Sequence, residues 1–411
     1  MLSIDVKSEI GHLEGVILHT PGAEIEKMTP STIKESLYSD LLNLNIAQKE
    51  YKCFEGVLSK WTKTYQVLSL LTEILKDEGK KINLLNQILK QEGKTFLFAE
   101  LIIYPPDILA KFLIEGYLFQ NDLHPKEYKK RKYILTPLYN FFFTRDASSS
   151  IYNQVLINSM QYEVRDRESL IMEVIFKEFF NTETINPKIL SNTANTEGGD
   201  ILVAREDVLL IGQGSRTNKD GIDFLVKYFA ARKQKQSILI QTLPDKPESF
   251  IHLDMVFTML DKDMCMVYEP LISKKNTQYN SYLIDIDNGH ISVKEMDSFM
   301  EGLKYLDFDL NPLKCGGDDP LFQDREQWHS GANFFAMGQG QIIGYERNRY
   351  TIETLNNNGF EVINSKDVCS DKVVLDKNKK FVVTLEAAEL PRGGGGARCM
   401  TMPIRRKPVD W

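Results

Sequence analysis

Apolar side chains in the first quarter of the chain recur at helical spacing. Residues 31–104 contain no proline, and lysine and glutamate fill many positions between the apolar ones. The apolar positions fall into three groups, which are Leu41, Leu42 and Ile46, then Val67, Leu70, Leu71 and Ile74, and then Leu84, Leu85, Ile88 and Leu89. Such spacing predicts amphipathic helices packed as a bundle. We therefore expect an inserted α-helical domain over residues 31–130 and a catalytic domain made of residues 1–30 and 131–411.

The rest of the chain consists mainly of short apolar runs separated by turns, which is typical of strands. Several runs share one plan, in which a polar residue precedes two strands joined by a tight turn and a helix follows. Asp146, Asp200 and Asp254 mark three such units at intervals of 54 residues, and Asn333 and Cys399 mark two more. Repeats of this size suggest a radially repeated α/β architecture in which equivalent turns converge on one axis. Residues distant in sequence would then share a central pocket.

The composition is that of an ordinary globular protein. The chain has 411 residues, of which 42% are hydrophobic and 26% charged, and its net charge is −7. This modest charge gives no reason to expect a nucleic acid as partner. The N-terminus lacks the features of a signal peptide, and no apolar run approaches the roughly 18 residues that span a membrane. The five cysteines include no CxxC pair, so neither a zinc ribbon nor a disulfide framework is indicated. We expect a cytoplasmic protein without a membrane partner.

A glycine-rich stretch near the C-terminus, residues 391–403, is the first candidate for chemistry. It contains four consecutive glycines, 393–396, which are costly to order and persist where backbone passes close to another group. Cys399 follows Arg392 and Arg398, and nearby positive charge lowers the pKa of a thiol. The stretch therefore presents a candidate nucleophile on a close-approach loop. The alternative is a flexible tail with an incidental buried cysteine.

Carboxylates, one histidine and the cysteine gather at the starts of the repeat units. Like charges in one pocket repel each other unless a cation or metal neutralises them. A metal held by His252, Asp254 and Cys399 is one explanation, although this spacing matches no common zinc pattern. The complete set comprises Asp146, Glu197, Asp200, His252, Asp254 and Cys399.

A cationic, planar substrate is the second explanation. Carboxylates bind a guanidinium group in bidentate fashion, so Asp146 and Asp254 are suited to grip its two sides. The thiolate would attack the guanidinium carbon, and His252 would protonate the leaving nitrogen and later activate water. Two residues also have simpler interpretations. Asp200 is equally suited to a turn, and Arg145 could form a plain ion pair with Asp146.

Five short motifs occur in an order that is highly specific as a set. They are residues 140–146 (NFFFTRD), 197–200 (EGGD), 252–254 (HLD), 331–333 (GAN) and 398–403 (RCMTMP). With these motifs and the helical segment after the first strand, the chain resembles the arginine deiminases of the pentein superfamily over essentially its whole length. The resemblance implies an α/β fold, a five-bladed pseudo-symmetric propeller with an inserted helical bundle. It also implies hydrolysis of L-arginine to L-citrulline and ammonia without cofactor or metal, and a homo-oligomer.

The resemblance further implies roles for individual residues. Cys399 matches the nucleophile and His252 the general acid and base. Asp146 and Asp254 match the carboxylates that hold the guanidinium, and Glu197 matches the acid that binds it and assists the histidine. Four more residues are expected to bind substrate, the first three of them at its carboxylate: Asn140, Arg165, Arg216 and Gly393.

Two positions in the glycine-rich stretch depart from the pattern of many family members. Gly394 stands where they have an arginine, and Arg398 stands where they have a histidine. We expect Arg398 to replace part of the missing positive charge beside Cys399.

Alternative functions stay open at this point. One is a related enzyme that acts on agmatine, a methylated arginine or a peptidyl arginine, or that transfers the amidino group. Another is a non-catalytic arginine-binding protein on the same scaffold. A binding set for an α-carboxylate favours free arginine, because agmatine has no carboxylate.

Overall fold

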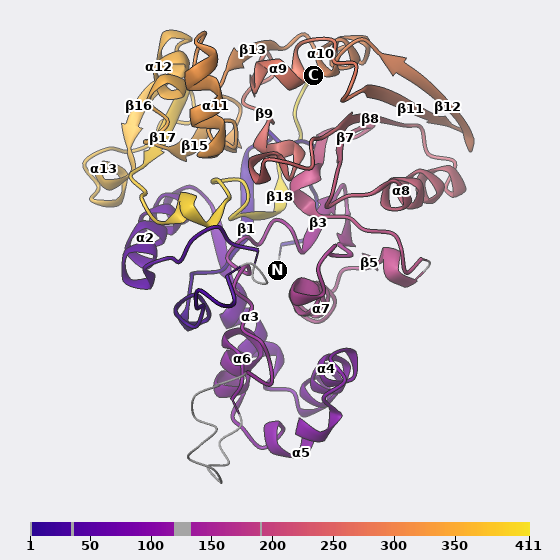
Figure 1. Cartoon of the computed structure of the whole chain (residues 1–411), viewed down its shortest axis with the longest axis vertical. Helices are drawn as coiled ribbons and strands as arrows, with labels where there is room; N and C mark the ends of the chain where they lie inside the picture. Colours follow the sequence, from indigo (N-terminus) through magenta and orange to yellow (C-terminus); the bar gives the residue numbers. More distant parts are fainter. Residues whose placement is uncertain (1, 34–36, 119–132, 190) are drawn as a thin grey trace.

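The computed structural model describes residues 2–33, 37–118, 133–189 and 191–411. In this part of the chain the strands form five small sheets, arranged around the upper part of the molecule in Figure 1 with a group of helices below them. The first sheet pairs strands from both ends of the chain in the order β18 (Met402–Arg406), β1 (Leu13–Leu18) and β2 (Lys63–Gln66). The fold is thus a mixed α/β fold.

The other four sheets follow in chain order. The second contains β3 (Ser148–Ile151), β4 (Gln154–Ile157) and β5 (Thr184–Ile185). The third contains β6 (Ile201–Arg205), β7 (Val208–Gln213), β8 (Gln236–Thr242), β11 (Ser281–Asp287) and β12 (His290–Met296). The fourth contains β9 (Phe257–Met259), β10 (Met264–Val267) and β13 (Asn311–Lys314). The fifth contains β14 (Phe335–Gly338), β15 (Gln341–Tyr345), β16 (Glu361–Asn364) and β17 (Phe381–Leu385).

All five sheets share one pairing pattern. An antiparallel pair is followed by a strand parallel to its second member: β3–β4 with β5, β6–β7 with β8, β9–β10 with β13, β14–β15 with β17, and β18–β1 with β2. In the last set the antiparallel pair joins the two ends of the chain. The predicted repeat unit is therefore present, and its fifth copy is completed by the terminal strands.

Parallel neighbours need a long crossover, which a helix usually supplies. Helix α7 (Asp166–Val174) lies between β4 and β5 in the chain, and α8 (Lys219–Ala231) lies between β7 and β8. Helix α12 (Arg349–Asn357), together with β16 and α13 (Ser365–Cys369), connects β15 to β17. The fourth unit has a longer connection, which includes α9 (Glu269–Ile272) and α10 (Phe299–Tyr305), and α11 (Pro320–Trp328) follows it.

Helix α2 (Leu44–Trp61) is the crossover of the first unit, because it joins β1 to the parallel strand β2. The helical segment predicted over residues 31–130 therefore contains part of a sheet unit. Its first group of apolar residues also differs from the prediction. Asn43 caps α2 by accepting a hydrogen bond from the backbone N–H of Ile46, so Leu41 and Leu42 precede the helix.

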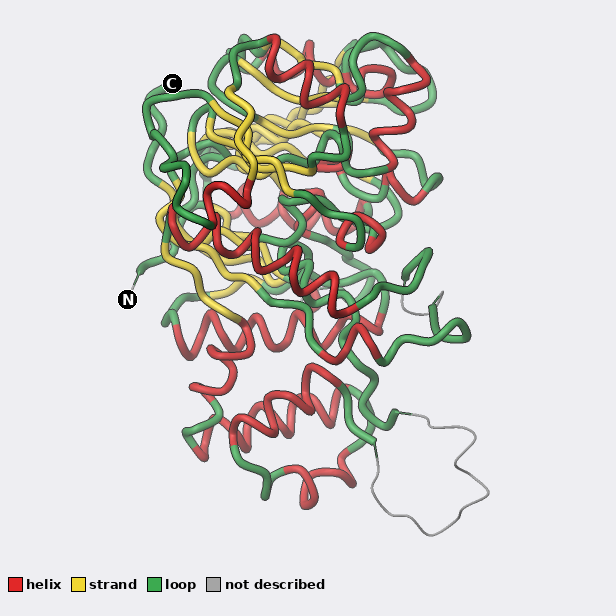
Figure 2. Tube along the Cα trace, turned by 90° about the vertical axis from the view of Figure 1, so that its left-hand side faces the viewer, coloured by secondary structure: helices red, strands yellow, loops and turns green. Residues whose placement is uncertain are grey.

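The remaining helices of this segment form a group beyond the sheets. They are α3 (Val67–Ile74), α4 (Glu78–Gln91), α5 (Phe98–Leu101) and α6 (Pro106–Glu115), seen at the bottom of Figures 1 and 2. The apolar positions predicted for α3 and α4 are buried, as expected from their spacing. Their core is continuous with that of the sheets, since it includes Ile17 of β1 and Val155 of β4. The predicted boundary at residues 130–131 lies outside the described residues.

The short helix α1 (Ala23–Glu26) follows β1. Among the described residues, no helix is both long enough and apolar enough to cross a membrane.

Candidate active site

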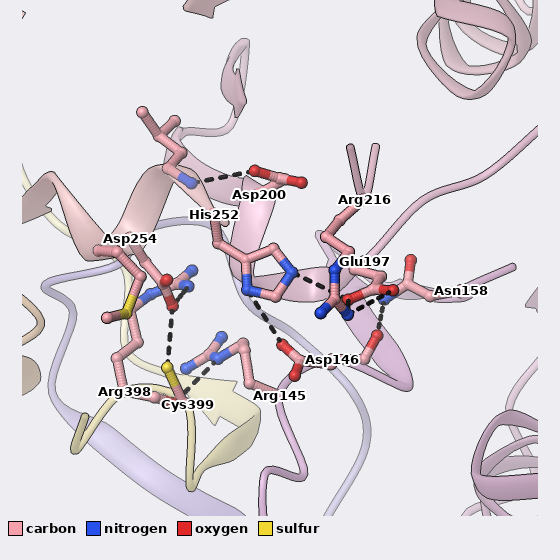
Figure 3. A network of polar contacts seen from close by, with 12 residues as sticks. Arg145, Asp146, Asn158, Glu197, Asp200, Arg216, His252, Asp254, Arg398 and Cys399 are labelled. Atoms are coloured by element: carbon pink, nitrogen blue, oxygen red, sulfur yellow. Dashed lines mark hydrogen bonds and ion pairs between the residues drawn. The ribbon is translucent and has the colours of Figure 1, made fainter. Parts of the chain in front are cut away.

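The marker residues of the repeat units lie just before the first strand of each antiparallel pair. Asp146 precedes β3, Asp200 precedes β6, Asp254 precedes β9, Asn333 precedes β14 and Cys399 precedes β18. Asp146 and Cys399 line one cavity of about 760 Å³. Asn333 and Asp254 contact Cys399 behind its wall, and Asp200 accepts a hydrogen bond from the residue that precedes Asp254. Figure 3 shows four of them, with His252 between the two ends of the polar network. The expectation that equivalent turns meet in one pocket is thus confirmed.

Cys399 is buried, 4% exposed, and lines this cavity. Its Sγ accepts a hydrogen bond from Asn333 Nδ2 at 3.3 Å and donates toward Asp254 Oδ2 at 3.8 Å. The glycine run makes this placement possible, because a Cβ on Gly396 would lie 2.4 Å from Asn333 Oδ1. The interpretation as a loose tail with an incidental cysteine is therefore wrong for this stretch.

The surroundings of Cys399 raise the pKa of its thiol well above the ordinary value. Burial is the largest cause, and the carboxylates of Asp254 and Asp146 add to it, while Arg398 opposes them only weakly. Arg392 turns toward the mouth of the cavity, where its Nε donates to Asp40 Oδ2 at 3.1 Å. The prediction that the flanking arginines give a low thiol pKa is wrong in this structure.

His252 is held between two carboxylates. Its Nε2 lies 2.9 Å from Glu197 Oε2, and its Nδ1 lies 3.8 Å from Asp146 Oδ1. Burial alone lowers the pKa of this imidazole, but the charges of Asp146, Glu197 and Asp200 outweigh burial and raise the pKa to about 9. Gly199 permits the approach, since a Cβ there would lie 2.4 Å from His252 Nδ1. At neutral pH the imidazole is protonated and suited to donate a proton.

Two buried arginines pair with the carboxylates on either side of this histidine. Arg165 Nη1 donates to Asp146 Oδ2 at 2.8 Å, and Arg216 Nη1 donates to Glu197 Oε2 at 3.2 Å. Burial raises the pKa of Glu197, but Arg216 and His252 reverse this effect and hold the pKa below its ordinary value. These partners keep Glu197 ionised in a site where an unpaired charge would be costly.

Asp254 is paired on one oxygen only. Its Oδ2 accepts a 2.8 Å hydrogen bond from Arg398 Nη1, whereas its Oδ1 is buried without a hydrogen-bond partner among the described residues. Asp146 is similar, since nothing in the described part of the chain donates a hydrogen bond to its Oδ1, although Arg165 occupies Oδ2. Glu168 Oε1 and Asp200 Oδ2, farther from the thiol, also lack a partner among the described residues. Buried carboxylate oxygens are usually satisfied, so the open oxygens of Asp146 and Asp254 indicate room for a donor ligand.

The residues predicted to bind substrate also meet this cavity. Asn140, Arg165, Arg216 and Gly393 line its wall together with Asp146, His252 and Cys399. Glu197 and Asp254 do not line it but lie directly behind His252 and Cys399.

Gly394, at the position of the family arginine, lies where the loop leaves open space. Its φ is +86°, a backbone conformation that favours glycine. A Cβ added to it would meet no heavy atom of the described residues within 4 Å. The described residues therefore leave room for a larger side chain at this position.

Several supporting residues were not found from the sequence. Asn158 Nδ2 donates to the backbone oxygen of Asp146 at 2.8 Å, and Glu168 Oε2 accepts from Arg165 Nε and Nη2 at 3.0 and 2.7 Å. Glu9 pairs with Arg398 from the far end of the chain. Asn158 is a polar residue in an apolar run, whereas Glu9 and Glu168 stand among polar residues, and neither setting specifies a partner.

The two residues with simpler interpretations also have defined contacts. Asp200 Oδ1 accepts from the backbone N–H of Leu253 at 3.0 Å, so Asp200 does hold a turn beside His252. Arg145 donates through Nε to the backbone oxygen of Arg398 and through Nη2 to Thr401, both at 3.3 Å, rather than to its neighbour.

A metal site was one alternative for this cluster. Asp146, Glu197 and His252 each offer a ligand atom, and these atoms lie within 4.8 Å of one another. Both carboxylates are already neutralised by buried arginines, and the imidazole carries a raised pKa, whereas metal ligation needs a neutral imidazole. The donor set therefore fits ion pairing better than metal binding. The three residues proposed as ligands from the sequence, His252, Asp254 and Cys399, do not form such a group among the described residues.

Comparisons with known proteins agree with this geometry. A family model described as "Arginine deiminase" matches residues 110–406. An arginine deiminase of Bacillus thuringiensis subsp. konkukian is 32% identical, with 99% of each chain covered. Among solved structures, an amidinotransferase from Microseira wollei, SxtG, has a TM-score of 0.55 at 13% identity and covers 99% of this chain and 98% of its own. The N-terminal domain of ArgZ, a cyanobacterial arginine dihydrolase bound to product, has a TM-score of 0.55 at 13% identity, covering 95% and 97%. These two structures share the pentein-type fold, and the chain belongs to the arginine deiminase family.

Proposed function

We propose that this protein hydrolyses L-arginine to L-citrulline and ammonia through a covalent amidino-cysteine intermediate. One observation carries the proposal: a buried thiol, a protonated histidine and the open carboxylate of Asp146 line a single cavity, and the open carboxylate of Asp254 lies directly behind the thiol. A guanidinium group is planar, cationic and rich in N–H donors, so it matches open carboxylate oxygens on two sides. Family membership supports the same reaction.

Binding of the guanidinium prepares the nucleophile. The open oxygens of Asp146 and Asp254 receive its N–H groups, and its positive charge offsets the two carboxylates that raise the pKa of Cys399. The thiol then releases its proton to solvent and becomes the thiolate, which is the reactive form. The same carboxylates keep the guanidinium protonated, so that its carbon stays electrophilic.

The chemistry proceeds in two balanced steps. The thiolate of Cys399 forms a bond to the guanidinium carbon, and the bond from this carbon to a terminal nitrogen breaks as His252 donates a proton and ammonia leaves. His252, now neutral, removes a proton from water, whose oxygen attacks the same carbon. The bond to sulfur breaks, the proton left on the oxygen passes to solvent, where it converts ammonia to ammonium, and citrulline leaves. The starting thiolate and imidazolium are then restored. Glu197, 2.9 Å from His252 Nε2, stabilises the positive imidazole in both steps.

Recognition of the other end of the substrate is assigned to Asn140, Arg165 and Arg216. All three line the cavity, and arginine side chains bind carboxylates in bidentate fashion. Arg216 also lies over the ring of Tyr162, 4.8 Å from its centroid, which supports its orientation. Agmatine lacks the carboxylate that these groups require, and a peptidyl arginine carries an amide in its place. Gly393 lines the same wall of the cavity with its backbone, since it has no side chain.

The architecture is proposed to be a five-bladed, pseudo-symmetric propeller in which each of the five sheets is one blade. The shared strand pattern and the terminal strand pair support this arrangement. We place the inserted helical domain at α3 to α6, later than residue 31, because α2 and β2 complete the first unit. A cytoplasmic location and a homo-oligomeric assembly stay predictions.

The test is release of citrulline and ammonia from L-arginine by the purified protein. Cys399→Ala is measured beside it, and agmatine is offered as a second substrate. Citrulline from arginine alone, lost in the cysteine variant, is the expected result. Turnover of agmatine at a comparable kcat/KM would contradict the assignment of the carboxylate-binding residues, and absence of arginine turnover would contradict the proposed reaction.

A further inference from the structure

Arg398, the residue before the nucleophile, has a binding geometry of its own. Its side chain is 1% exposed. Nε and Nη2 donate to Glu9 Oε2 and Oε1, both at 3.0 Å, and Nη2 also donates to the backbone oxygen of Ile201 at 3.0 Å. Nη1 donates to Asp254 Oδ2 at 2.8 Å. A guanidinium bound on three sides in this way has little freedom to turn, so its position is well defined.

Arg398 and Cys399 meet the same oxygen of Asp254. Figure 3 shows the cysteine sulfur and the guanidinium of Arg398 beside this carboxylate. With Oδ2 occupied, the carboxylate cannot rotate without breaking a charged hydrogen bond, and the oxygen left without a partner among the described residues is Oδ1. Arg398 therefore decides which oxygen of Asp254 is available to a ligand.

The charge of Asp254 also depends on this contact. The pKa of Asp254 is raised above its ordinary value, chiefly by burial, and Arg398 is the largest influence that opposes this rise. A protonated carboxyl group would offer a guanidinium neither a negative charge nor two acceptors. The titratable and charged groups that face Asp254 are Arg398, His252, Asp146, Arg145 and Cys399.

Glu9 brings the N-terminal segment into this arrangement. It is buried, and burial raises the pKa of its carboxyl group, but the charges of Arg398 and Arg145 outweigh this effect and lower the pKa to about 2. Its bidentate contact fixes the guanidinium of Arg398 from the side opposite Asp254. Glu9 does not line the cavity, and the hydrogen bonds of Arg398 connect it to Asp254.

We propose that Arg398, anchored by Glu9, is a positioning residue that keeps Asp254 ionised and oriented to receive the guanidinium of the substrate. The proposal rests on the function proposed above. The competing interpretation is a purely structural role, in which Arg398 only joins the two ends of the chain. Arg405 and Glu14 provide a matched comparison, because they also join the two ends of the chain with a 3.0 Å ion pair, but in β18 and β1 and near the surface.

The experiment measures ligand binding by calorimetry in the Cys399→Ala background, where no turnover occurs. L-arginine and L-citrulline are compared, since they differ in the charge of the group that meets Asp254. Arg398→Gln is expected to weaken L-arginine binding by about 10-fold or more at neutral pH and to change L-citrulline binding by less than about twofold. The loss for L-arginine should shrink as the pH is raised, because Asp254 then ionises without help. Glu9→Gln should give a smaller loss of the same kind.

Two controls keep the outcome decisive. Arg405→Gln and Glu14→Gln should leave the binding of both ligands unchanged. If Arg398→Gln does not fold, Arg398→Lys, which keeps one charge, takes its place together with Glu9→Gln. Equal weakening of both ligands, or a loss that does not depend on pH, would overturn the proposal. The wild-type chain is assayed for citrulline release in parallel, so that failure of the proposed reaction is seen separately.

Discussion

The helical group α3 to α6 and the site at the strand ends are both buried, but by opposite means. In α3 and α4 the buried side chains are apolar and recur at helical spacing, as Leu84, Leu85 and Ile88 do. At the strand ends many buried side chains are charged, and some of them pair with residues from a distant part of the chain. Glu9 and Arg398, for example, are 389 residues apart.

This difference separates what each region contributes. Apolar burial stabilises the helical group in proportion to the area removed from water, whatever the identity of the neighbours. Burial of charge at the strand ends is unfavourable unless every group has a partner, and here the described residues leave one oxygen each of Asp146 and Asp254 unsatisfied. The helical group therefore contributes apolar stabilisation, whereas the strand ends keep charged groups poised for chemistry.

The largest effect is expected for Cys399→Ala, which should remove activity without lowering stability. Cys399→Ala should lower kcat for citrulline release by at least about 10⁴-fold, because no other group replaces the nucleophile. The free energy of unfolding should stay the same or rise, since the thiol lies beside the carboxylate of Asp254. Steady-state assays and urea unfolding of the same preparations test this. A large loss of stability would show that the cysteine also supports the fold.

Glu197→Gln should affect both activity and stability. His252 loses the carboxylate that stabilises its positive form, so kcat should fall by roughly 10²- to 10⁴-fold. Arg216 loses its charged partner inside the protein, which should cost about 3–5 kcal/mol of unfolding free energy. Pre-steady-state ammonia release and chemical unfolding measure the two quantities. An active, fully stable variant would contradict the assigned ion pairs.

Leu85→Ala tests the contribution of the helical group to stability. Leu85 is fully buried in α4, and its truncation should lower the free energy of unfolding by about 2–5 kcal/mol. The kcat per folded molecule should be unchanged, because the cavity lies at the strand ends. Thermal unfolding and active-site titration check the two parts. A change in kcat would mean that the helical group is coupled to the site.

The pH dependence of stability should carry the signature of His252. Its pKa is raised from 6.5 to about 9 in the folded protein, so its contribution is fully present below 6.5 and is lost as pH rises through 9. The free energy of unfolding should therefore fall by about 1–3 kcal/mol across this window. His252→Asn should flatten that part of the profile. A wild-type profile without a decline would contradict the raised pKa.

Local pattern in the sequence was enough to predict the helical positions of α3 and α4 and the repeat of polar residues before paired strands, and the ordered motifs carried the resemblance to a family. These features depend on periodicity and on residue type, both of which are visible in one chain. The start of α2 was missed, because the cap at Asn43 places the first helical residue later than the apolar spacing suggested.

Other features depend on contacts between distant segments. Strand β2 has no apolar run, and it is a strand because β1 supplies its hydrogen bonds. The pKa of Cys399 was misjudged because neighbours in sequence, Arg392 and Arg398, turn toward Asp40 and Glu9, while the carboxylates that face the thiol come from other units. Coulomb energies depend on distance and burial, and sequence adjacency determines neither.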